Sequence, residues 1–157
     1  MKAKILLTIA VLMIGSMAIK AQTNMFDRLS NNKEISTVYI SKSLLGMMPN
    51  MDMGGADIKG LANKLEQLEI YSSENSKDAS KLMRTEIEAM VRAKTYETLM
   101  SIKDKDDNIT FYAHKDKDKF KDLIMFINEP NECTIIRIIG NFTADDIQSV
   151  MNNKKKK

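Results

Sequence analysis

Short apolar runs alternate with short polar links in the second half of the chain, which is the pattern of an antiparallel sheet. Four runs are predicted as strands: 96–103, 108–114, 122–128 and 132–140. Links this short suit hairpins, because parallel strands need a crossover of roughly a dozen residues or more. The last two runs are apolar at both alternating positions, so we expect them in the middle of the sheet.

The first half of the chain mixes strand and helix patterns. Residues 35–40 and 68–73 are predicted as strands, because they are rich in residues that favour extended structure. Segments 23–32 and 41–48 are predicted as short helices. Pro, Asn, Asp and a Gly-Gly pair mark 49–55 as a loop.

Three amphipathic helices complete the set of elements. One follows the N-cap candidate Asp57, and its apolar positions recur at helical spacing: Ile58, Leu61, Ala62 and Leu65. A second begins near Asn75 or Ser76 and carries the apolar stripe Ala79, Leu82, Met83, Ile87, Met90 and Val91. The third covers 143–151, where Thr143 and Asp146 form a capping box with Asp in place of Glu.

These elements predict an α+β fold. We expect one antiparallel sheet, made of the four-strand C-terminal meander and one or two N-terminal strands, with helices packed mainly on one face. The apolar character of both faces of the central strands leaves room for a homodimer.

The first 21 residues have the pattern of a secretory signal. Lys2 and Lys4 precede the uncharged stretch 5–18, and Ala21 is placed for cleavage. The stretch is shorter than the roughly 20 apolar residues that a membrane span needs, although an uncleaved anchor is the alternative. We therefore predict a signal peptide over 1–21, a single domain over 22–151 without a transmembrane segment, and a disordered basic tail over 152–157.

Charge and cysteine content exclude several classes of function. Lys2, Lys4 and Lys20 lie in the predicted signal, and without them the basic residues only equal the 21 acidic ones. The last four residues are all Lys, so the folded body is slightly acidic, whereas a nucleic-acid binder carries a basic face. Cys133 is the single cysteine, which excludes an intramolecular disulfide and suggests a small buried side chain.

A methionine-rich run is the first candidate site. Met47, Met48, Met51 and Met53 lie within seven residues. Thioethers suit Cu(I), and methionine is also a reversible sink for oxidants. The run contains no histidine, and methionine equally suits an adaptable contact with a partner or loose packing on the core.

Three other candidates are weighed against structural roles. Arg137 interrupts an Ile-rich strand, so it either pairs with a carboxylate of a neighbouring element or contacts a ligand or partner. His114 is the single histidine and is predicted at the surface. The run 104–108 begins like a calcium-binding loop but has Ile109 and Lys115 where Gly and Glu are required, so it is predicted as a hairpin turn.

Several stretches together resemble a known family of small exported proteins of the Bacteroidetes type, domain of unknown function 4252. They are Ser36–Lys42, Met47–Met51, Leu68–Glu74, Glu132–Arg137 and Gly140–Thr143. The resemblance extends over about 26–151. It implies an exported protein of a Gram-negative envelope, hence the periplasm, and carries no reaction, ligand or catalytic residue.

Three functions are compatible with the sequence. The favoured one is a non-enzymatic binding or accessory module of the cell envelope, with no cofactor, whose partner contacts include Leu44, Met48 and Arg137. The alternative is a protein that handles Cu(I) or oxidants through the methionine run. The least favoured is an enzyme with a dispersed site around Arg137 and Tyr112.

Overall fold

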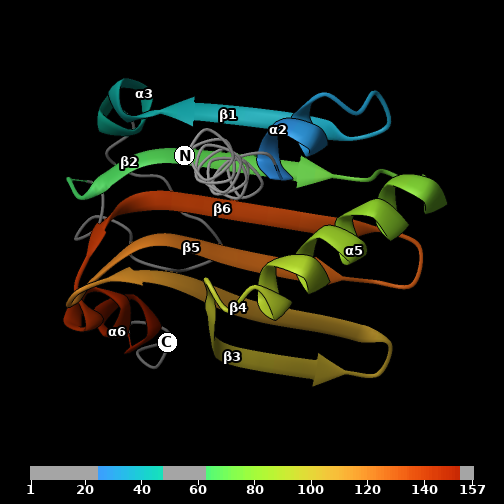
Figure 1. Cartoon of the computed structure of the whole chain (residues 1–157). Coiled ribbons are helices and arrows are strands. Elements are labelled where there is room, and N and C mark those ends of the chain that lie inside the picture. The colour runs from blue at the N-terminus through green and yellow to red at the C-terminus, as the bar shows by residue number, and fades with distance from the viewer. Residues whose placement is uncertain (1–24, 48–62, 153–157) are drawn as a thin grey trace, which may run out of the picture.

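The computed structural model describes residues 25–47 and 63–152, whose centre is one six-stranded antiparallel sheet (Figure 1). Its strands lie in the order β1-β2-β6-β5-β4-β3. Their bounds are Ser36–Ser41 for β1, Leu65–Ser72 for β2, Glu97–Asp104 for β3, Asp107–Asp116 for β4, Lys119–Asn128 for β5 and Cys133–Phe142 for β6. The predicted α+β fold is confirmed.

The four C-terminal strands form the predicted meander of consecutive hairpins. Lys105 and Lys117 adopt positive φ angles of 51° and 55° in the turns before β4 and β5. The run 104–108 is therefore a hairpin turn, as its failed calcium-loop pattern predicts. β2 pairs with β6, the last strand of the meander, and β1 forms the outer edge of the sheet beyond β2. The two apolar strands β5 and β6 are therefore central.

Two helices cover one face of the sheet, which we call the helix-covered face. They are α2 (Met25–Ser30) and α5 (Lys77–Arg92). The Ser76 side chain caps α5 by accepting a hydrogen bond from the Ala79 amide at 3.2 Å. Their buried side chains form one core with those of the strands: Met25, Leu29, Ala79, Met83, Ile87, Met90, Tyr71, Ile124, Phe126, Cys133 and Ile135. Val91, predicted in the buried stripe, is 39% exposed.

Two shorter helices pack at one end of the opposite face. They are α3 (Lys42–Met47) and α6 (Ala144–Asn152). A second core lies there, made of Leu45, Leu65, Ala113, Phe120 and Phe142, with Ile147 packed against it. The expectation that helices lie mainly on one face thus holds for α2 and α5, whereas α3 and α6 occupy an end of the other.

The capping box of α6 is present as predicted. The Thr143 amide donates to Asp146 Oδ2 at 2.7 Å, and the Asp146 amide donates to Thr143 Oγ1 at 3.3 Å. Lys64 adds an ion pair to the other Asp146 oxygen at 2.6 Å. The start of the last helix is therefore joined to the beginning of β2.

One predicted helix position is wrong. Leu65 was expected at the end of a helix that begins near Asp57, but it is the first residue of β2, where it is buried in the second core. Residues 63 and 64 of that predicted helix form a turn. Its residues 57–62 lie outside the described residues, as do the predicted signal 1–21 and nearly all of the predicted tail.

Candidate functional site

Arg137 lies on the helix-covered face at the centre of a cluster of charged groups. Its Nε and Nη2 donate to Asp122 Oδ2 at 2.8 and 2.6 Å, and its Nη1 donates to Glu69 Oε2 at 3.1 Å. Asp122 comes from β5 and Glu69 from β2, the two neighbours of β6. The Phe26 ring of α2 lies 3.8 Å from the guanidinium carbon. Arg137 therefore adopts the structural alternative, pairing with carboxylates of adjacent strands.

Two tyrosines complete this cluster. The Tyr71 hydroxyl donates to Glu69 Oε2, and the Tyr96 hydroxyl donates to Asp122 Oδ2, each at 2.9 Å. Burial, together with the adjacent carboxylates, raises the pKa of both phenols well above the ordinary value. Both phenols therefore remain protonated donors at neutral pH.

The cluster holds one guanidinium against two carboxylates, and its hydrogen bonds are unevenly distributed. Asp122 Oδ2 accepts from Arg137 and Tyr96, whereas Asp122 Oδ1 is buried without a hydrogen-bond partner among the described groups. The side chains that donate to Glu69 and Asp122 come from β2, β6 and the link before β3. This arrangement ties β2, β5, β6 and the link before β3 together, which is a structural role.

His114 is half-buried rather than a surface residue. Its Nδ1 is 2.8 Å from the Thr95 carbonyl oxygen, and its ring packs against Tyr96 with ring centroids 5.5 Å apart. The histidine thus holds the link between α5 and β3 against β4.

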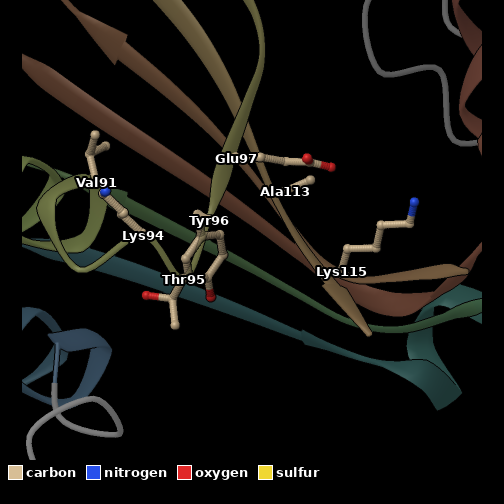
Figure 2. A pocket seen from close by; sticks show the side chains of 7 residues that line it. All are labelled: Val91, Lys94, Thr95, Tyr96, Glu97, Ala113 and Lys115. Carbon is tan, nitrogen blue, oxygen red and sulfur yellow. The ribbon is translucent and has the colours of Figure 1, made fainter. Parts of the chain in front are cut away.

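A shallow hollow of about 340 Å³ lies beside this link (Figure 2). It is lined by Val91, Lys94, Thr95, Tyr96, Glu97, Ala113 and Lys115. Figure 2 shows the side chains of Glu97 and Lys115 extending toward the same side of it. Ligand sites are usually enclosed and lined mainly by apolar groups. This hollow is open with a charged rim, so we do not assign it a ligand.

Cys133 is completely buried at the start of β6, which confirms its predicted packing role. Its amide donates to Ser73 Oγ at 2.8 Å, and its Sγ is 3.4 Å from Asn128 Oδ1. Burial raises the pKa of the thiol, so the reactive thiolate is disfavoured.

The predicted methionine site is described only at its first residue. Met47 ends α3 and is 69% exposed, and Leu44 on the same helix is 40% exposed. Met48, Met51 and Met53 lie outside the described residues. In residues 25–47 and 63–152, no group of three His, Cys, Asp or Glu side chains is arranged to hold a metal ion.

The face opposite α2 and α5 carries a feature that the sequence only hinted at. The strand registers join one residue from each strand into a single row: Val38, Ile70, Ile136, Met125, Phe111 and Met100. We call this the apolar row, because all six side chains are apolar. Between Asp122 and Ile127 of β5, the residues on the helix-covered face are buried, whereas those on the opposite face are only half-buried.

The neighbouring rows differ in what covers them. On one side, Leu68, Ile138 and Leu123 lie beneath or beside the core formed with α3 and α6. On the other side, Ile127, Ile109 and Ile102 continue the apolar surface over β5, β4 and β3. The apolar row and these three isoleucines form what we call the apolar patch. The helices of the described residues leave it uncovered, and Val38, Met100 and Ile102 are 48%, 38% and 46% exposed.

Comparisons with known proteins give a family and no activity. The family model described as "Domain of unknown function (DUF4252)" matches residues 26–150. No curated protein matches the sequence. Within the described part of the chain, none of the helices has the length and apolar character needed to cross a membrane.

Proposed function

Because the chain belongs to the DUF4252 family, which assigns no activity, we propose from its physical features that it is an exported, non-enzymatic binding or accessory module of the cell envelope. The observation that carries the proposal is the apolar patch. Its side chains are half-buried on the inner strands and exposed on β1 and β3, and a contiguous apolar surface of this kind is typical of an interaction site. The charged groups on the other face serve the fold, because Arg137 is held by carboxylates of its neighbouring strands.

The pattern of the first 21 residues supports export. A short basic start, an uncharged stretch and a small residue, Ala21, after it are the parts of a secretory signal. The balance of acidic and basic residues in the remainder argues for a protein or apolar partner rather than a nucleic acid. We propose a periplasmic location, with Leu44 and Met48 as further candidate contacts.

The test is crosslinking of the tagged protein in intact cells, followed by identification of what co-purifies from the envelope fraction. A photoreactive residue replaces Met100 in the apolar patch, and a matched probe replaces Thr98 on the same strand but the other face. We expect recurrent crosslinks from position 100 only. Equal crosslinking from both positions, or none from position 100, would refute the role of the patch.

Export is tested separately by the mass of the protein recovered from the periplasmic fraction. A mature N-terminus near Gln22 is expected. Recovery of the uncleaved chain in the cytoplasm would contradict the envelope location whatever the patch binds.

A further inference from the structure

We propose that the apolar patch is the contact surface of a reversible homodimer, in which two copies of this chain pack face to face. The inference rests on the proposed function, because it names the partner of the same surface. It goes further in stating that the partner is a second copy, and it predicts a measurable oligomeric state.

The absence of charge in the patch favours an identical partner. In a two-fold contact each surface meets its own counterpart, so a charged side chain near the axis faces a like charge. All nine positions of the patch carry aliphatic, methionine or phenylalanine side chains, and Glu97 lies outside it in the adjacent row. The patch can therefore meet itself without electrostatic repulsion.

The size of the patch sets the strength of the contact. Six strands spaced about 4.8 Å apart give the apolar row a length of roughly 24 Å, and the three added isoleucines lie about 7 Å along the strands. Each copy thus offers roughly 300 Å² of flat apolar surface, which is small beside the ~800 Å² per partner of a stable complex. The expected dimer is weak and depends on concentration.

The layers of the fold permit this packing. Sheets stack face to face at a separation of about 10 Å. α3 and α6 cover only the end of this face around Leu45 and Phe142. A two-fold axis along the apolar row would place these helices of the two copies at opposite ends of the contact, where they flank it.

The test compares two double variants that add the same charge to the same two edge strands. Val38→Lys/Met100→Lys alters both ends of the apolar row, and Thr37→Lys/Thr98→Lys alters exposed neighbours on the helix-covered face. Lysine is well tolerated on exposed edge strands. Circular dichroism and thermal unfolding are recorded first, to establish whether each variant folds. Sedimentation velocity of the mature protein is recorded from ~1 μM to ~1 mM, the range in which weak association is measurable.

We expect the wild type and the Thr37→Lys/Thr98→Lys variant to shift from monomer to dimer over this concentration range. The Val38→Lys/Met100→Lys variant should dimerise at least ~100-fold more weakly, because each dimer then confronts four new like charges. A wild type that stays monomeric up to ~1 mM, or dimers equally weakened in both variants, overturns the homodimer. If that monomer still gives position-100 crosslinks to another protein in cells, only the identity of the partner is wrong, and the proposed function stands.

Discussion

Replacement of Arg137 by Met tests whether the charged cluster holds the sheet together. The guanidinium makes hydrogen bonds to Asp122 and Glu69, and only 21% of its side chain is exposed. The two carboxylates are more deeply buried, with 9% and 11% of their side chains exposed. Met fills a similar volume but leaves both carboxylates without their cationic partner.

The expected loss follows from this burial. Removing one partner of a buried ion pair costs about 3–5 kcal/mol, and the partial exposure of Arg137 places the expected loss near the lower figure. A domain has only about 5–15 kcal/mol of stability in total, so the effect should be large. Arg137→Lys should lose less, because an ammonium keeps the charge but cannot contact both carboxylates with the same planar geometry.

Urea unfolding of Arg137→Met measures this loss, with Arg92→Met as the matched control. Arg92 pairs with Glu88 on the surface of α5, where both side chains are more than two thirds exposed. The control should lose no more than about 0.5 kcal/mol. A loss of less than about 1 kcal/mol for Arg137→Met, at an unchanged denaturant slope, would refute the reasoning that the cluster is shielded from water.

A triple variant separates two causes of the expected loss: the missing attraction between Arg137 and the carboxylates, and the buried negative charge that remains without a partner. In Arg137→Met/Asp122→Asn/Glu69→Gln the buried carboxylates are neutral, so no uncompensated charge remains. Part of the stability lost in Arg137→Met should therefore return. A triple variant that is less stable than the single one would show that hydrogen bonds to the carboxylates, rather than their charge, dominate.

Three further changes test other parts of the fold. The pKa values of Tyr71 and Tyr96 are raised in the folded protein, so the unfolded chain loses these phenol protons at a lower pH. Urea titrations should therefore show the free energy of unfolding falling above pH ~10, by up to ~1.4 kcal/mol per pH unit for each tyrosine. Tyr71→Phe should remove the contribution of Tyr71 to this pH dependence, and an unchanged pH dependence in that variant would contradict the prediction. The hydrogen bond from Lys64, with those from Thr143, lowers the pKa of Asp146 to about 2, so its contribution is present above pH ~4 and is lost as the pH falls toward 2; a carboxyl NMR titration with an ordinary midpoint would refute it. Gly140→Ala should lower stability by about 1–3 kcal/mol in thermal unfolding, because the added Cβ would overlap the Lys64 carbonyl oxygen and the Phe142 ring, and an unchanged Tm would show that the strands move apart freely.

Local signals in the sequence predicted most of the elements. The alternation and short links of the C-terminal half define its four strands. The start of α5 was predicted near Asn75 or Ser76, of which Ser76 is the cap, and the capping box of Thr143 and Asp146 before α6 was predicted directly. Leu65 was misassigned because four apolar positions at helical spacing can include the first residue of a following strand. Its actual place is set by contacts with β6, far along the chain.

The candidate surfaces depend on long-range pairing that no local pattern contains. Arg137 meets Glu69 only because β6 lies between β2 and β5, and the two residues are 68 positions apart. The apolar row likewise needs the register of every strand pair. A bulge between Thr98 and Met100 turns Met100 toward the row, whereas simple alternation from Glu97 would place it on the other face.

The distribution of charge over the two faces is itself an argument for a covered apolar patch. A sheet with one face in solvent places polar side chains on that face and apolar ones beneath its helices. Here the central strands do the reverse in part: Arg137, Asp122 and Glu69 lie on the helix-covered face, whereas Ile136 and Met125 lie on the opposite one. The charged side chains of the cluster are stabilised on the covered face by pairing with one another. The side chains of the apolar row face the other way, where contact with water is unfavourable for them. Such a sheet is more stable when a second layer covers the row, and in the proposed homodimer the second copy supplies that layer.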